Sequence, residues 1–177
     1  MSNEKTVALL GAAYRTEING YFFYTTAASL TADAKGKNIF NQLAKEELEH
    51  VGVLSALADS LKGGSGWKTY DDALKSRVAT SKGAPIFDND GGAIDRLRKG
   101  FSDQNAVRMA AESEEKAVEF YSDLLKQATE PTEKTVLIKI LEMEKNHLKI
   151  LRWEAESLAN TGFWCGNLEF SVEKESD

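Results

Sequence analysis

Four segments of the chain carry apolar residues at the spacing of amphipathic helices. They span residues 4–31, 35–62, 102–129 and 131–160. Gly36 lies at the expected break between the first two, and the glycine-rich residues 63–66 end the second. Ser102 or Asp103 is the expected N-cap of the third segment, and Pro131 occupies the first turn of the fourth, where its missing N–H costs little. The pattern predicts an all-α protein.

The lengths of the connections predict how these helices are joined. Only a few residues separate the first segment from the second and the third from the fourth, so each pair is expected to form an antiparallel hairpin. Residues 63–101 are long for a plain loop and suit a crossover along a bundle, with a short helix around residues 71–78. Two hairpins joined by one long crossover are the connectivity of a ferritin-like four-helix bundle.

This bundle is expected to form one domain over residues 1–160, followed by a C-terminal tail, residues 161–177. The tail contains the run Gly-Phe-Trp-Cys-Gly. We expect either Phe163 or Trp164 to pack on the bundle, since a large aromatic side chain gains much from burial.

Acidic residues and histidines interrupt the apolar stripe of every predicted helix. In chain order, the interruptions are Glu17, Glu47, His50, Glu114, Glu144 and His147. The chain has two histidines, and each belongs to a Glu-x-x-His pair whose members share one helix face. The first three interruptions recur 97 residues later as the last three, which indicates an internally duplicated hairpin. Such a duplication folds with pseudo-twofold symmetry, which would bring all six side chains around one centre.

This constellation predicts a site for two metal ions. Four ionised carboxylates facing one core would cost more than a whole domain's stability, and no Lys or Arg lies in the stripes to compensate. Two divalent cations would balance the four negative charges. Carboxylate and imidazole ligands favour iron, with manganese or zinc as alternatives, and the lack of thiolates disfavours a structural zinc site. The predicted ligands are those of the carboxylate di-metal centres of ferritin-like bundles.

Each of these residue assignments has a simpler structural alternative. A single Glu-x-x-His pair is usually a solvated helix face; two pairs at matching offsets favour metal binding. Glu115 is the alternative to Glu114, since an error of one residue in helical phase would exchange them. Tyr24 and Tyr121 would either donate hydrogen bonds to metal carboxylates or be ordinary core aromatics. The acidic residues off the stripes are expected to be solvated: Glu46, Glu49, Glu112, Glu119 and Glu142.

Charge and cysteine content exclude several function classes. The 177 residues include 22 Lys and Arg against 28 Asp and Glu, a net charge of −6, which argues against nucleic-acid binding and against docking on anionic membranes. The one cysteine, Cys165, excludes an internal disulfide and a CxxC zinc ribbon. No targeting segment and no membrane-length apolar stretch is evident, so a cytoplasmic location is expected.

Over residues 5–160 the sequence resembles the rubrerythrin family of the ferritin-like superfamily. The resemblance rests on Glu17, on Glu-Leu-Glu-His at 47–50, on Glu-Lys-Asn-His at 144–147, and on Glu-Glu-Lys-Ala-Val-Glu-Phe-Tyr at 114–121. It implies that Glu47 and Glu144 bridge two iron ions. It further implies that Glu17 and Glu114 are terminal ligands, while His50 and His147 each bind one iron. Members of the family reduce hydrogen peroxide, or sometimes dioxygen, with electrons from a rubredoxin, and they commonly form homodimers.

The chain departs from the family pattern at two points. Typical rubrerythrins carry a C-terminal rubredoxin domain with four cysteines, where this chain has residues 161–177 with Cys165 alone. They also have another glutamate three residues after the first one of the third helix, involved in redox-linked metal movement, where this chain has Ala117. Ferritins lack the second Glu-x-x-His, and bacterioferritins place a haem-binding methionine where Leu48 stands here.

The sequence therefore favours a di-iron oxidoreductase that reduces peroxide or dioxygen with an external donor such as rubredoxin. The alternatives are an iron storage protein of ferritin-like type, which would form a large hollow oligomer, and a structural or regulatory bundle that retains the site.

Overall fold

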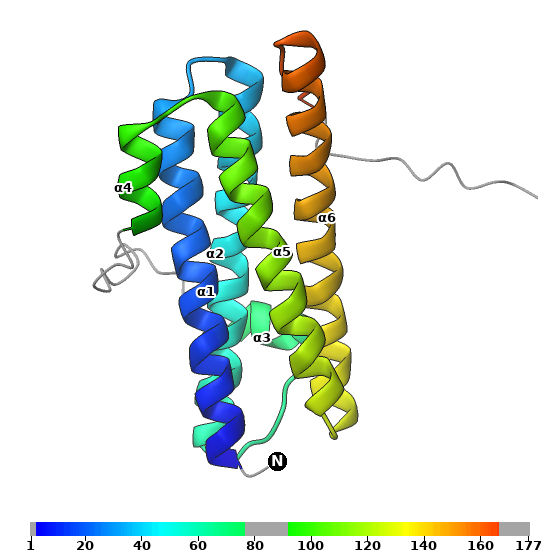
Figure 1. The fold of residues 1–177 in the computed structure, drawn as a ribbon. Coiled ribbons are helices and arrows are strands. Elements are labelled where there is room, and N and C mark those ends of the chain that lie inside the picture. The colour runs from blue at the N-terminus through cyan, green and yellow to red at the C-terminus, as the bar shows by residue number, and fades with distance from the viewer. Residues whose placement is uncertain (1–2, 77–91, 167–177) are drawn as a thin grey trace, which may run out of the picture.

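The computed structural model describes residues 3–76 and 92–166, and in this part of the chain every regular element is a helix (Figure 1). The elements are α1 (Asn3–Leu30), α2 (Ala34–Lys62), α3 (Tyr70–Ser76), α4 (Gly92–Lys99), α5 (Asp103–Gln127) and α6 (Pro131–Thr161). The expectation of an all-α fold with four long helices is confirmed.

Local side-chain chemistry explains where the long helices begin. Ser102 is the N-cap of α5, since its hydroxyl accepts a hydrogen bond from the backbone N–H of Asn105 at 3.1 Å. Before α6, Glu130 and Glu133 form a reciprocal capping box, with Pro131 in the first turn. Asp33 caps α2, so the expected break at Gly36 is wrong: that glycine lies inside α2.

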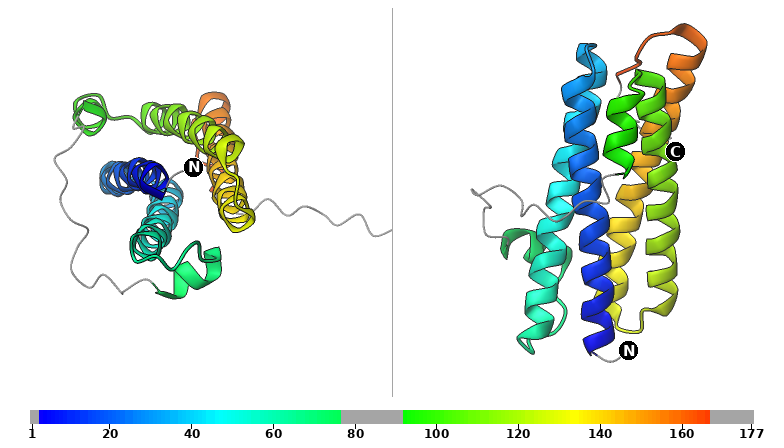
Figure 2. Two further views of the ribbon diagram at one scale, coloured as in Figure 1. Left: turned by 90° about the horizontal axis from the view of Figure 1, so that it is seen from below. Right: turned by 60° about the vertical axis from the view of Figure 1, so that its left-hand side comes forward.

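The helices are arranged as two antiparallel hairpins, with α1 packed on α2 and α5 packed on α6 (Figures 1 and 2). The crossover runs from the lower end of α2 to the upper end of α5, so α1 and α5 are antiparallel neighbours (Figure 1). This arrangement is the ferritin-like bundle that the sequence predicted.

The described residues of the crossover contain two short helices. Helix α3 confirms the short helix expected near residues 71–78, of which residues 77 and 78 lie outside the described part of the chain. Helix α4, which packs on α1 near the upper end of the bundle, was not predicted (Figure 2). It has only eight residues, fewer than the window over which helical periodicity is recognised, and it buries a single hydrophobic side chain, Leu97.

Two apolar clusters fill the bundle, one toward each end. The upper cluster includes Tyr24, Phe40 and Leu151, and the lower one includes Leu57 and Tyr121. On every long helix the interrupting acidic residue or histidine falls between the residues of these two clusters. The acidic residues are thereby enclosed between two hydrophobic layers, which keep bulk water from them along the bundle axis.

Of the two aromatic residues proposed for the tail contact, Trp164 is the one that packs. Its side chain is 4% exposed and meets Phe40 edge-on with ring centroids 5.5 Å apart, whereas Phe163 is 74% exposed. A Cβ atom at Gly36 would lie 2.2 Å from the Trp164 ring, which explains a glycine inside α2. The buried Glu154 accepts hydrogen bonds from the backbone N–H groups of Cys165 and Gly166, so the chain after α6 is fastened to the bundle.

No helix in the described residues combines the length and the apolar character needed to cross a membrane.

Candidate metal centre

The bundle brings the six predicted residues together halfway along its axis. They form two groups, each able to offer four ligand atoms that lie within 4.8 Å of one another. The first group is Glu17, Glu47, His50 and Glu144, and the second is Glu47, Glu114, Glu144 and His147. Because Glu47 and Glu144 belong to both groups, the two overlapping clusters suggest a binuclear metal site.

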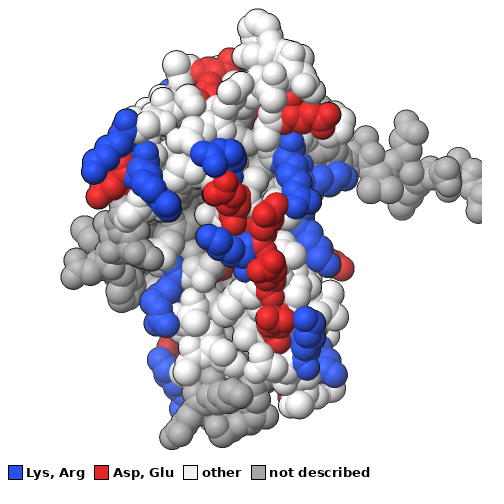
Figure 3. Space-filling view, in the orientation of Figure 1, with Lys and Arg blue, Asp and Glu red and all other residues white. Residues whose placement is uncertain are grey.

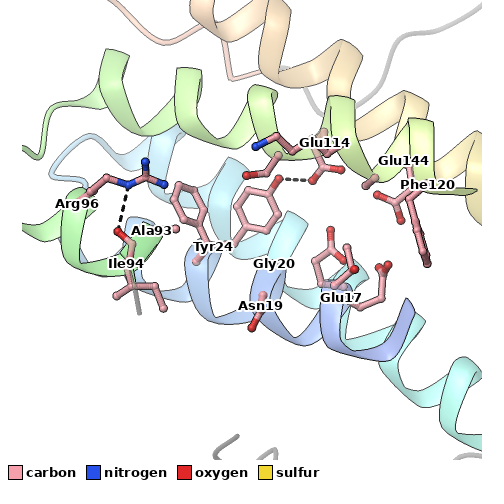
Figure 4. Close-up of a pocket in the computed structure, with 17 residues that line it drawn as sticks. Glu17, Asn19, Gly20, Tyr24, Ala93, Ile94, Arg96, Glu114, Phe120 and Glu144 are labelled. Atoms are coloured by element: carbon pink, nitrogen blue, oxygen red, sulfur yellow. Dashed lines mark hydrogen bonds between the residues drawn. The ribbon is translucent and has the colours of Figure 1, made fainter. Parts of the chain in front are cut away.

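Helix geometry accounts for this convergence. Glu47 and His50 lie one turn apart on the inner face of α2, and Glu144 and His147 do the same on α6. Glu17 on α1 and Glu114 on α5 approach from the opposite side of the bundle (Figure 4). None of the six side chains is more than 5% exposed.

Both histidines turn the same ring nitrogen toward the carboxylates. His50 Nδ1 lies 2.9 Å from Glu17 Oε2 and 3.0 Å from Glu144 Oε1. His147 Nδ1 lies 3.3 Å from Glu47 Oε1 and 3.5 Å from Glu144 Oε2. The two rings are stacked with centroids 5.8 Å apart. Each Nδ1 is thus the atom presented to a metal ion, and each Nε2 points outward.

Burial and mutual repulsion divide the carboxylates into two classes. Burial raises the pKa of Glu17 and Glu114 well above the ordinary value, and the nearby Glu47 and Glu144 carboxylates raise it further. Burial acts in the same direction on Glu144, but the two histidine rings outweigh it and lower the pKa of this carboxyl. The same rings lower the pKa of Glu47 against its burial. Without metal, therefore, Glu17 and Glu114 hold a proton more readily than Glu47 and Glu144 do.

The histidines respond in the complementary way. Burial alone would lower the pKa of both imidazoles. The facing carboxylates of Glu144 and Glu17 reverse that effect at His50 and raise its pKa well above the usual value. Glu144 and Glu46 do the same at His147.

The donor set fits a pair of divalent cations. Glu144 Oε1 and His147 Nδ1 are buried and have close charged neighbours, His50 Nδ1 at 3.0 Å and Glu47 Oε1 at 3.3 Å, but neither atom makes a hydrogen bond of proper geometry, which is costly for polar atoms unless another ligand satisfies them. Among the described residues, every ion pair of the four carboxylates is with His50 or His147, and none is with Lys or Arg. Two divalent ions would satisfy the orphaned atoms and balance four carboxylates, and oxygen and imidazole donors suit iron, manganese or zinc.

Two tyrosines bind the far carboxylates across the bundle. The Tyr24 hydroxyl on α1 donates to Glu114 Oε1 on α5, and the Tyr121 hydroxyl on α5 donates to Glu17 Oε1 on α1. Both side chains are buried. Of the two interpretations left open by the sequence, the structure supports hydrogen bonding to the carboxylates of the cluster. Each hairpin thus donates one tyrosine hydroxyl to a glutamate of the other hairpin, as the pseudo-twofold symmetry of the duplicated sequence requires.

The structure shows which of the adjacent residues Glu114 and Glu115 lies in the buried cluster. Glu114 is 4% exposed and belongs to the cluster, whereas the Glu115 side chain is half exposed and accepts a hydrogen bond from Arg152 at 2.7 Å. Glu115 belongs to the outer surface formed by α5 and α6. There acidic side chains run along the middle of the face, with Lys and Arg side chains on both sides (Figure 3).

One acidic residue that was expected to be solvated contacts the centre. Glu46 Oε2 accepts a hydrogen bond from His147 Nε2 at 2.7 Å, and the Glu46 side chain is only 25% exposed. The sequence expectation for Glu46 is therefore wrong. Glu46 is on α2 and His147 on α6, so only the packing of the two hairpins reveals the contact.

A cavity of about 480 Å³ connects the centre with the side of the bundle where α1, α4 and α5 meet. Its inner end reaches all four carboxylates, and its walls include the aromatic rings of Tyr24 and Phe120 (Figure 4). Gly20 on α1 and Ala117 on α5 also line it; they are equivalent under the 97-residue offset. These two small residues leave the metal centre open toward the cavity.

The match to a known family agrees with this geometry. The model of the family described as Rubrerythrin matches residues 8–155, which is most of the chain. The chain belongs to the rubrerythrin family. No curated protein and no solved structure matches it. As a rubrerythrin, it combines the six Glu and His residues in one buried centre, with Ala117 lining the adjoining cavity.

Proposed function

We propose that this rubrerythrin is a di-iron oxidoreductase that reduces hydrogen peroxide, with dioxygen as a second oxidant. The observation that carries the proposal is the pair of buried Glu/His clusters that share Glu47 and Glu144 and open onto a cavity. Membership of the rubrerythrin family supports the same chemistry.

In this proposal each side chain has a defined part. Glu47 and Glu144 would be shared by the two metal ions, Glu17 and His50 would hold one of them, and Glu114 and His147 would hold the other. Two ferrous ions held there would supply the two electrons that, with two protons, convert one hydrogen peroxide into two water molecules. Manganese or zinc fits the same donors, so iron is part of the proposal.

In this proposal the oxidant reaches the centre through the cavity. The cavity ends at the carboxylates, and its lining there includes Gly20, which has no side chain, and Ala117, which has only a methyl group. Tyr24 and Tyr121 hold Glu114 and Glu17 in orientation. A water molecule occupies about 30 Å³ of liquid, so a cavity of about 480 Å³ far exceeds the needs of hydrogen peroxide. It is also large enough for an organic hydroperoxide.

The electrons have to come from outside the bundle. A rubredoxin centre needs four thiolates, and these 177 residues contain one cysteine, Cys165. After one peroxide is reduced, the centre is oxidised and needs two electrons from another carrier. We propose a small external donor such as rubredoxin for this step.

Anaerobic stopped-flow oxidation tests the proposal. Protein loaded with two ferrous ions per chain is mixed with one equivalent of hydrogen peroxide, and the oxidation is followed optically. We expect one fast phase that consumes about one peroxide per chain, with steady consumption only after rubredoxin and its reductase are added. Glu47→Ala is expected to abolish the fast phase, and the surface variant Glu115→Ala to retain it.

Two outcomes would overturn the proposal. Ferrous protein that stays unoxidised by peroxide for minutes would favour the iron storage alternative. Donor-independent conversion of peroxide to dioxygen would instead indicate a catalase activity, and manganese would then replace iron as the proposed metal.

We further propose a homodimer. Sizing of the native protein tests this point, because a storage protein has to form a large hollow oligomer and a dimer cannot enclose a mineral.

A further inference from the structure

The two histidines of the centre differ in what their outer nitrogens contact. His147 Nε2 donates to Glu46 Oε2 at 2.7 Å. His50 Nε2 instead lies 3.5 Å from the thioether sulfur of Met143. Glu46 and Met143 directly precede Glu47 and Glu144, and they are equivalent under the 97-residue offset of the duplication. The symmetry that holds for all six predicted ligands therefore fails at the residue behind each histidine.

The surroundings extend this difference. On the His147 side, Gln42 Nε2 donates to Glu46 Oε1 at 2.6 Å, so two hydrogen bonds fix the Glu46 carboxylate. The residue equivalent to Gln42 under the 97-residue offset is Lys139, whose ammonium group contacts helix α3. It pairs with Asp71 at 2.7 Å and lies 4.3 Å from the centre of the Tyr70 ring.

Helix α3 closes the His50 side. The Tyr70 hydroxyl of α3 contacts the Met143 sulfur at 3.6 Å. Among the described residues, the structure gives His50 Nε2 no carboxylate partner; its contact is the thioether. The crossover has no counterpart in the other half of the bundle. Its helix α3 therefore covers the side of His50, whereas the outer nitrogen of His147 contacts Glu46.

The chemical consequence concerns metal affinity. A carboxylate that accepts the outer N–H of a ligating histidine fixes the ring and makes its other nitrogen a stronger donor, and loss of such a partner typically costs about 10- to 100-fold in metal affinity. A thioether is only a weak acceptor. Both metal positions share Glu47 and Glu144, and each has one further glutamate, so the residue behind the histidine is the main difference between them.

We propose that the two metal positions are inequivalent: the position served by His147 binds a divalent cation about 10- to 100-fold more tightly than the one served by His50, and Glu46 is the positioning residue responsible. This inference rests on the proposed occupancy of the centre by two metal ions, but it does not depend on the reaction with peroxide.

Metal binding without turnover tests the inference. Metal-free protein is titrated with Zn²⁺ against a competing chelator, and crystals grown with one equivalent of Co²⁺ per chain are measured for anomalous scattering. We expect two binding steps separated by about 10- to 100-fold, with the first cobalt ion beside His147. Two equal steps, or a first ion beside His50, would overturn the proposal.

Exchange of the two residues gives the sharper test. Glu46→Met is expected to lower the affinity of the tighter Zn²⁺-binding step until the two steps have the same affinity. Glu46→Gln keeps an uncharged hydrogen-bond acceptor, so it is expected to give an intermediate difference in affinity. The double exchange Glu46→Met with Met143→Glu is expected to move the first cobalt ion to the His50 position. Because Glu46 is partly exposed, Glu46→Met is not expected to unfold the protein.

A control separates this effect from a change of surface charge. Glu142→Met removes an exposed carboxylate next to Met143 and is expected to leave both steps unchanged. Unchanged steps in Glu46→Met would refute the inference and leave the proposed function intact. Failure of the unmodified protein to bind two metal ions would refute both.

Discussion

The hydroxyl of Tyr24 donates a hydrogen bond to the carboxylate of Glu114, which lies on the other helical hairpin. Tyr121 returns the same interaction to Glu17. Each hairpin therefore orients a carboxylate of its partner, and the centre depends on the correct docking of the two halves. The contact is buried, so an unpaired carboxylate oxygen there could not be compensated by bulk water.

We expect Tyr24→Phe and Tyr121→Phe each to weaken the metal position whose glutamate the tyrosine orients, Glu114 beside His147 and Glu17 beside His50. Each removes one donor from a buried carboxylate, which should destabilise the protein by about 1–3 kcal/mol and weaken metal binding by about 10-fold or more. Denaturant unfolding and competitive metal titration measure the two effects. Tyr21→Phe, at a partly buried position outside the cluster, is the matched control, and equal metal affinity in all three variants would contradict the assigned role.

Adjacent glutamates on α5 are expected to behave in opposite ways. Glu114→Ala removes a side chain of the cluster, so the variant should retain fewer than two metal ions per chain by elemental analysis. Glu115→Ala removes only an exposed partner of Arg152 and should retain both ions, with little change in stability, because exposed ion pairs contribute about 0–1 kcal/mol. Full occupancy in Glu114→Ala would exclude Glu114 as a required ligand.

The sequence predicted the four long helices and the chemistry of the centre because both depend on local periodicity. Apolar spacing places the helices, and Glu-x-x-His together with the 97-residue offset identifies the six residues of the cluster. The offset also favoured Glu114 over Glu115, because a duplication preserves helical phase, and Glu114 is the one that lies in the buried cluster. These six residues lie together in the structure, while their role as metal ligands stays a prediction.

Contacts between distant segments were not predictable in the same way. The pairing of Glu46 with His147 joins α2 to α6 and leaves no periodic pattern. Gly36 was expected to end a helix because glycine commonly does so, yet a tryptophan 128 positions later requires the absence of a side chain there. Helix α4 has only eight residues, which is too short for its periodicity to be recognised in the sequence. For Glu46 and Gly36, tertiary packing outweighed local preference.

Metal removal is expected to make stability fall as pH rises from 6 to 8. In the metal-free fold the pKa values of Glu17, Glu114, His50 and His147 are raised, so these groups retain protons that the unfolded chain has released. Stability from a raised pKa is complete below the unfolded value, about 4.3 for Glu and about 6.5 for His, and is lost as pH rises from there through the higher folded value. The lowered pKa values of Glu47 and Glu144 act only at acidic pH, where their contribution is lost as pH falls.

Metal-loaded protein should show the opposite trend, because ligands have to lose protons to bind metal and binding therefore strengthens with pH. Thermal unfolding at pH 6 and pH 8, with Zn²⁺ and with a chelator, measures the difference. We expect the gap in Tm between the two forms to widen at pH 8, by about 2–4 °C for each kcal/mol of stability in a protein of this size. A gap that narrows with pH would contradict the burial of four converging carboxylates.

The last prediction concerns the size of the oxidant. Ala117 lines the cavity between the bundle surface and the carboxylates, so Ala117→Leu should narrow the route without removing a side chain of the cluster. We expect the variant to keep two metal ions per chain and to react more slowly with peroxides, with a larger loss for cumene hydroperoxide than for hydrogen peroxide, because the bulkier molecule needs more of the cavity. Stopped-flow oxidation of the ferrous protein gives both second-order rate constants. Ala159→Leu, on the exposed surface of α6, controls for the added side chain and should match the unmodified protein. Equal slowing of both oxidants would mean that the cavity admits the oxidant without selecting it by size, and no slowing of either would place the entrance elsewhere on the bundle.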